Sequence, residues 1–71
     1  MEVEVTPGVF VHAELEDELY TLRLVGNHSR YEFCADEELP STIAILCDLD
    51  MNDPMVRRRV LLAAERIVSG R

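Results

Sequence analysis

The chain has 71 residues, of which 48% are hydrophobic, and it carries 14 acids against seven arginines and no lysine, giving a formal net charge of −7. This length predicts one small domain over residues 1–71, and the apolar content excludes an intrinsically disordered chain. No apolar run approaches the roughly 20 residues that a membrane-spanning helix needs. Residues 1–5 are acidic where a secretory signal is basic. We therefore expect a cytoplasmic domain that does not bind a membrane.

The first half of the chain predicts an antiparallel meander of three or four strands. Apolar and polar side chains alternate in four segments: residues 2–5, 9–15, 19–25 and 29–35. Turn-forming or polar residues connect them: Pro7-Gly8 in a type II turn, Glu16-Asp17-Glu18, and Gly26-Asn27 in a tight hairpin turn. Both faces of segment 19–25 are partly apolar, which indicates a central strand with one face covered by other elements.

The segment 36–52 allows two interpretations. Its acids at 36–38 and the apolar residues Leu39, Ile43 and Leu46 have helical spacing. The residues from Ile43 to Leu49 also alternate as they would in a strand. We favour a short helix over about 39–48, because acids and Ser41 are typical of helix starts.

The segment 54–69 predicts an amphipathic helix with both ends marked. Asp53 is an N-cap residue, Pro54 fits the first helical position, and Gly70 lies where a left-handed C-cap is expected. One broad arc of this helix is apolar, with Arg57 near its edge: Val56, Val60, Leu61, Ala63, Ala64, Ile67 and Val68. We expect this arc to pack on the sheet. The predicted fold class is therefore α+β: a small antiparallel β-meander packed by a C-terminal α-helix, with a shorter helix before it.

The opposite arc of this helix mixes arginines with large apolar side chains, unlike an ordinary solvated face. If the protein forms a homodimer or another homo-oligomer, we expect the contact here, through Met55, Arg58, Arg59, Leu62 and Arg66. A chain this short has a thin core, and association with a second copy is one way to support it.

Charge is divided unevenly along the chain. Residues 54–71 hold five arginines and one acid, for a net +4, whereas residues 1–53 hold thirteen acids and two arginines, for a net −11. Three consecutive arginines at 57–59 suggest phosphate contacts. However, the −11 of the remaining chain repels a polyanion, so we do not expect direct binding to nucleic acid.

One segment resembles a catalytic motif. The apolar run 43–47 followed by Asp48-Leu49-Asp50 is similar to the nucleophile motif of haloacid dehalogenase-like phosphatases. The resemblance implies that Asp48 attacks phosphorus and Asp50 acts as acid and base beside magnesium. Asn52 stands where that family has Thr or Ser, and only nineteen residues follow it, too few for the family's remaining strands and metal ligands. We therefore expect no enzymatic activity and no catalytic residue.

Two metal-binding patterns begin but are not completed. The residues from Asp48 onward are similar to the start of an EF-hand loop. However, Asp53 occupies the loop position that requires glycine, and Arg59 occupies the position that requires glutamate. The residue types that bind zinc are spaced like no zinc motif: His12, His28, Cys34 and Cys47. We expect neither a metal nor a cofactor, and we expect both cysteines to be reduced, buried thiols.

The acids themselves are the strongest functional signal. They cluster where we expect loops and strand ends: Glu14, Glu16, Asp17, Glu18, Asp36, Glu37, Glu38, Asp48 and Asp50. A negative surface steers a domain onto a basic partner. The leading hypothesis is a non-enzymatic protein-binding module or inhibitor that engages the basic surface of a partner protein as a nucleic-acid mimic. The alternative is a regulatory or scaffold subunit that self-associates through its C-terminal helix. An acidic composition is also typical of proteins from salt-rich cells.

Overall fold

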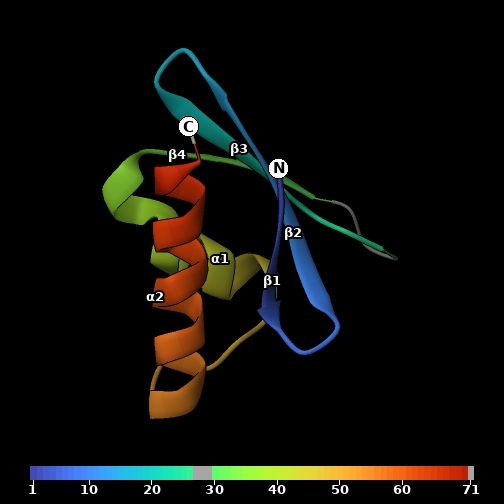
Figure 1. Ribbon diagram of the computed structural model, residues 1–71, viewed down its shortest axis with the longest axis vertical. Helices are drawn as coiled ribbons and strands as arrows, with labels where there is room; N and C mark the ends of the chain where they lie inside the picture. Colours follow the sequence, from blue (N-terminus) through green and yellow to red (C-terminus); the bar gives the residue numbers. More distant parts are fainter. Residues whose placement is uncertain (27–29, 71) are drawn as a thin grey trace.

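A computed structural model describes residues 1–26 and 30–70 and contains one antiparallel sheet and two α-helices (Figure 1). The sheet has the order β1-β2-β3-β4, so each strand pairs with its neighbours in sequence. The elements are β1 (Glu2–Thr6), β2 (Val9–Glu16), β3 (Leu19–Leu24), β4 (Tyr31–Cys34), the 3₁₀ helix η1 (Asp36–Glu38), α1 (Leu39–Leu46) and α2 (Pro54–Ser69). The predicted α+β class, with a four-stranded meander and two C-terminal helices, is confirmed.

The hairpin turns follow the predicted connections where the structure describes them. Gly8 has a φ of 81°, as the third residue of a type II turn requires. Asp17 and Glu18 form a two-residue turn with φ values of 50° and 68°. Both values lie in the left-handed region that a type I′ turn needs and that residues other than glycine rarely adopt.

The third connection is described only in part. Asn27, the second residue of the predicted Gly26-Asn27 turn, lies outside the described residues, as does the predicted start of the fourth strand at residue 29. Among described residues that strand is shorter than predicted, because Arg30 precedes it and Ala35 already caps η1.

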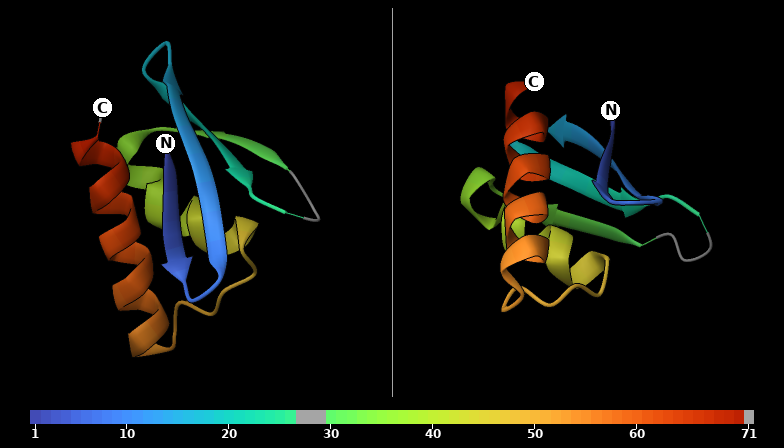
Figure 2. Two further views of the ribbon diagram at one scale, coloured as in Figure 1. Left: turned by 45° about the vertical axis from the view of Figure 1, so that its right-hand side comes forward. Right: turned by 60° about the horizontal axis from the view of Figure 1, so that its bottom comes forward.

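Both helices cover the same face of the sheet, and the core lies between the two layers. Alternate strand residues point into it, which is why one face is apolar. The buried side chains are Val3, Val5, Val11, Ala13, Tyr20, Leu22 and Cys34 from the sheet, and Leu39, Ile43, Leu46, Val60, Ala63, Ala64 and Ile67 from the helices. Helix α2 lies beside β1, while α1 contacts β3, β4 and α2 (Figure 2).

The helix interpretation of segment 36–52 is correct, and the strand alternative is wrong. Residues 36–38 form η1, and α1 follows directly with Pro40 in its first turn. Leu39, Ile43 and Leu46 fall on one helical face and are at most 2% exposed. Helix α1 is shorter than predicted because Asp48 adopts a left-handed φ of 55° just after its end.

Helix α2 begins and ends where the sequence predicts. Asp53 Oδ1 accepts a hydrogen bond of 3.0 Å from the Met55 N–H, as an N-cap does. The predicted left-handed C-cap is wrong, because Gly70 has a φ of −85°. Its N–H instead reaches the carbonyls of Arg66 at 3.0 Å and Ile67 at 3.3 Å, so the last turn tightens without reversing its hand.

The buried stripe of α2 is narrower than predicted. Val60, Ala63, Ala64 and Ile67 are buried, at i, i+3, i+4 and i+7 spacing. Leu61 was assigned to the core arc but is 45% exposed, because α2 lies along one side of the sheet and only its inward stripe is covered. None of the described helices combines the length and the apolarity that crossing a membrane requires.

Candidate interaction surfaces

Six exposed or half-buried acids gather at one end of the sheet. Strand β3 runs antiparallel to β4, with Tyr20 opposite Cys34, so the chain that enters β3 lies beside the chain that leaves β4. The β2–β3 turn and η1 therefore occupy the same end (Figure 1). We call this group the acidic end: Glu16, Asp17, Glu18, Asp36, Glu37 and Glu38.

Three features hold the acidic end in place. The Glu38 side chain accepts a hydrogen bond of 3.0 Å from the Ala35 N–H, which closes the η1 turn. Leu39, directly after η1, has no exposed surface and anchors the turn to the core. On the other side, Glu16 pairs with Leu19 across the two-residue turn. The carboxylates thus project from short, anchored turns rather than from a long loop.

The other three predicted acids do not belong to this end. Glu14 lies on the uncovered face of the sheet, where its Oε1 is 2.9 Å from Nε2 of His12. Asp48 and Asp50 lie in the α1–α2 connection, because α1 carries the chain away from η1 toward the start of α2. Asp50 there accepts a hydrogen bond of 2.9 Å from the Asn52 N–H. The structure therefore brings six of the nine predicted acids together.

The uncovered face of the sheet combines polar and aromatic side chains. Strand register aligns Glu2, His12, Arg23 and Tyr31 in one row across all four strands. A depression of about 140 Å³ beside this row is lined by His12, Glu14, Thr21, Arg23 and Tyr31. His12 Nδ1 and Thr21 Oγ1 are buried there without a hydrogen-bond partner among the described residues. The hydrogen bond from His12 lowers the pKa of the Glu14 carboxyl.

Aromatic rings also mark this face. Tyr31 and Phe33 are 62% and 66% exposed, and Phe10 is 38% exposed. Alternation along β4 puts Tyr31 and Phe33 on the same side of the strand, opposite the buried Cys34. The expected burial of Cys34 could have identified them. Side chains alternate along a strand, so the residues on the other side of β4 from a core residue face away from the core.

The predicted self-association residues lie on the surface of α2. Met55 is 66% exposed and Leu62 is 50% exposed. Arg58, Arg59 and Arg66 are exposed as well, and no arginine of α2 forms a salt bridge within residues 1–26 and 30–70. This face therefore presents apolar surface and unpaired positive charge together.

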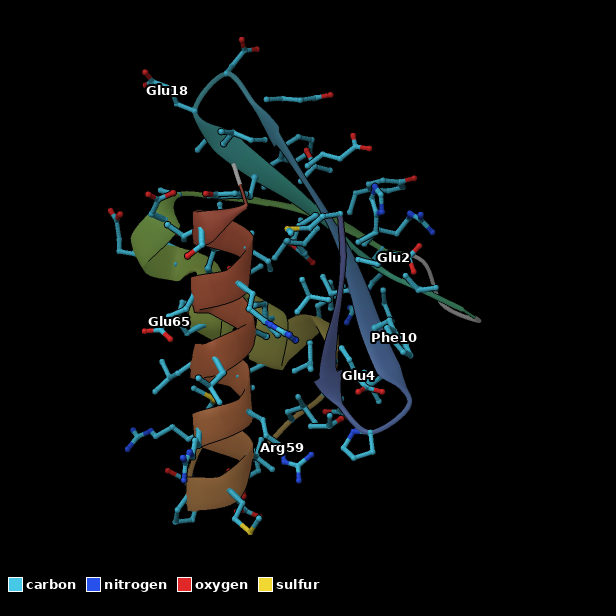
Figure 3. The ribbon with its side chains drawn as sticks, viewed as in Figure 1. Glu2, Glu4, Phe10, Glu18, Arg59 and Glu65 are labelled. Atoms are coloured by element: carbon cyan, nitrogen blue, oxygen red, sulfur yellow. The ribbon has the colours of Figure 1, made fainter. Side chains whose placement is uncertain are left out.

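A groove separates this helix from β1. It has a volume of about 450 Å³ and is lined by Glu4, Val5, Thr6, Arg59, Leu62, Ala63, Glu65, Arg66 and Ser69. In Figure 3, Arg59 extends from α2 on the side of β1, where Glu4 lies, whereas Glu65 points away from β1. The sequence does not predict this groove, because no pattern within β1 or α2 indicates that the two elements lie side by side.

The residues proposed for metal or nucleophilic chemistry do not assemble. Cys34 and Cys47 are free; Cys34 is buried as expected, but Cys47 is only half-buried. Burial raises the pKa of both thiols, which disfavours the reactive thiolate. Within the described part of the chain, no three His, Cys, Asp or Glu side chains form a group that could hold a metal ion. His28 lies outside that part. Residues 43–46 are helical, so Asp48 does not end a strand as the phosphatase motif requires.

Comparisons with known proteins identify no relative. No known protein family matches the chain, and neither a curated protein nor a solved structure is similar to it. The surfaces described above are therefore the basis for any proposal about function.

Proposed function

We propose that this protein is a non-enzymatic binding module whose acidic end engages a basic surface of a partner protein, in the place that nucleic acid would occupy. The observation that carries the proposal is the gathering of six carboxylates at one end of the sheet. Glu16, Asp17 and Glu18 are exposed, and no arginine of α2 forms a salt bridge with them within the described residues. Such a module would act as an inhibitor of its partner.

Charge and rigidity both favour this role. A single-sign cluster raises the rate of encounter with a basic surface, an effect that salt screens over about 8 Å at physiological ionic strength. The acids stand on a two-residue turn and on a 3₁₀ turn anchored by buried Leu39. Carboxylates that are already ordered lose less conformational entropy on binding than those on a flexible tail.

The experiment compares two triple charge reversals that change net charge equally. Glu16→Lys, Asp17→Lys and Glu18→Lys alter the acidic end, and Asp48→Lys, Asp50→Lys and Glu65→Lys form the control elsewhere on the surface. Tagged proteins are incubated with host lysate, and captured proteins are quantified by mass spectrometry with and without added heparin. We expect the first triple, but not the control, to abolish capture of basic partners, and heparin to compete with the wild type. Capture that the first triple leaves unchanged would disprove the proposal.

A second candidate is a regulatory or scaffold subunit that self-associates through α2. The exposure of Met55 and Leu62 favours it. The arginines oppose a two-fold contact, because Arg58, Arg59 and Arg66 outnumber Glu65 and two copies of this face repel each other. Leu62→Glu tests the idea: a lower mass by light scattering supports it, and an unchanged monomeric mass in wild type and variant removes it.

A further inference from the structure

The outer edge of β1 offers unpaired backbone groups. Strand β1 is at the end of the sheet and pairs only with β2. Met1 and Ala13 exchange both backbone hydrogen bonds, each 2.8 Å long. Because such pairs alternate along an antiparallel ladder, Val3 also directs its N–H and C=O toward β2, and Glu2 and Glu4 direct theirs away from it. These outward groups have no backbone partner among the described residues.

The groove between β1 and α2 runs along this open edge. Leu62 stands on its helical wall with half of its surface exposed. Arg59 and Arg66 line the same wall, three residues before and four residues after Leu62. These offsets correspond to about 4.5 and 6 Å along the helix axis. The helical wall therefore presents the apolar side chain of Leu62 between two positively charged arginine side chains.

We propose that this groove binds an extended acidic peptide segment of a partner protein, which adds to β1 as a further strand. Strand addition at a sheet edge supplies affinity through the main chain and specificity through alternate side chains. Side chains on one face of a strand repeat at about 6.6–6.8 Å, which exceeds the offsets of Arg66 and Arg59 from Leu62 by less than about 1 Å and by about 2 Å. The long arginine side chains can span these differences. The segment therefore has the pattern acid-x-apolar-x-acid on the face that meets α2.

The charges of the groove select an acidic segment over a basic one. Glu4 and Glu65 also line it, so its formal charges sum to zero and the position of each charge decides what an incoming side chain meets. Glu4 alternates with the buried Val3 and Val5, so its side chain lies on the face of β1 away from α2, where its carboxylate accepts a 3.1 Å hydrogen bond from the Gly8 N–H. Glu65 points away from β1 (Figure 3). Arg59 and Arg66 lie with Leu62 on the side of α2 that lines the groove and have no salt bridge among the described residues, so an incoming side chain that faces α2 meets their positive charges.

A second copy of this chain fits the edge less well. Antiparallel pairing of two β1 strands would place Glu2 and Glu4 of both copies on one face, where like charges on neighbouring strands repel. The proposal is also independent of the acidic end, which lies across the sheet at the β2–β3 turn and binds a partner of opposite charge.

The first test uses the unmodified protein and a fluorescein-labelled peptide, Ser-Thr-Glu-Thr-Val-Thr-Glu-Thr-Ser. Fluorescence polarisation measures its affinity against a matched peptide with lysine in place of both glutamates. We expect the acidic peptide to bind about tenfold more tightly, since each exposed ion pair contributes little alone. Equal affinity of the two peptides would overturn the proposal.

Backbone pairing is tested with two N-methylated versions of the acidic peptide. One carries methyl groups on the amides of odd-numbered peptide positions and the other on those of even-numbered positions. Because only alternate amides face β1, one version should lose binding and the other should retain it. Equal loss in both versions would show that no strand forms.

The helical wall is tested by paired charge reversals with an equal charge change. Arg59→Glu with Arg66→Glu should reverse the preference toward the lysine peptide. Arg57→Glu with Arg58→Glu, at residues that line a neighbouring hollow of α2 but not the groove, should leave the preference unchanged. The position of the peptide is tested by NMR of the wild type. Changes in amide chemical shift on peptide binding should concentrate in residues 2–6 and 59–69. Changes confined to other residues would contradict the assignment. Pairing of two β1 strands that increases with protein concentration in the absence of peptide would also contradict it.

Discussion

The acidic end and the β1–α2 groove are both charged, but they present different parts of the chain to a partner. At the acidic end the backbone belongs to a hairpin turn and to η1, so mainly carboxylates are available. In the groove the backbone of β1 is itself available, beside Leu62 and two arginines. Under the two proposals, the first surface would select a partner by charge, and the second would require a defined strand register. The net charge of the sequence indicates the acidic end but not the groove.

The largest expected effect comes from the core residue that supports the acidic end. Leu39→Ala removes a side chain with no exposed surface and should lower the free energy of unfolding by about 2–5 kcal/mol. That is a large part of the roughly 5–15 kcal/mol typical of a domain. Urea unfolding followed by circular dichroism measures it. Ile45→Ala on the same helix, where Ile45 is 66% exposed, should change stability by less than about 0.5 kcal/mol.

A smaller effect is expected at the start of the groove's helical wall. Asp53→Ala removes the N-cap hydrogen bond to Met55 and should cost about 1 kcal/mol. Amide hydrogen exchange should become faster in the first turn of α2 and stay unchanged in the β2–β3 hairpin. Asp53→Asn retains a capping oxygen and is the control. A cost as large in the asparagine variant as in the alanine variant would refute the capping role.

The turn between β2 and β3 offers a substitution that should stabilise the domain, whereas the preceding ones destabilise it. Glu18 has a left-handed φ of 68°, and this region costs residues other than glycine about 1–2 kcal/mol. Glu18→Gly should therefore stabilise the domain by up to about 1 kcal/mol, because glycine's freedom in the unfolded chain offsets part of the gain. Thermal unfolding measures the change. The proposed function predicts weaker partner capture by the same variant, so its stability should rise while its binding falls.

The smallest effect concerns the uncovered face of the sheet. The hydrogen bond from His12 lowers the pKa of Glu14 in the folded state, so ionised Glu14 favours folding above its ordinary pKa. This contribution disappears as the pH falls through the lowered value. Titration of the Glu14 carboxyl by NMR should show a pKa below that of an unfolded peptide. His12→Gln should raise it toward the ordinary value, and no change would contradict the contact.

Local patterns predicted most of the fold. Alternation gave the first three strands to within about one residue, the capping signals of Asp53 and Pro54 gave the start of α2, and Gly70 gave its end. One error falls where a distant contact decides, and the other is local to the last turn of α2. Leu61 is exposed because α2 runs along one side of the sheet, and Gly70 needs no left-handed conformation because its N–H reaches two carbonyls of the last turn.

The surfaces were less predictable than the elements. The acids of the acidic end were identified, but the pairing of β3 with β4 decides that 16–18 and 36–38 meet and that Asp48 does not join them. The groove was missed entirely. It exists because the first strand and the last helix, which are separated by most of the chain, lie side by side, and the residue types of neither segment encode that contact.

The two-residue turn at Asp17-Glu18 also sets the alignment of the whole hairpin. Because side chains alternate between faces, one inserted or deleted residue would turn Tyr20 and Leu22 from the core to solvent. Substitution of Asp17 or Glu18 by another residue leaves this alignment in place, whereas a change in the length of the turn does not. During evolution this constraint would preserve the spacing of the turn even where its charge is free to vary.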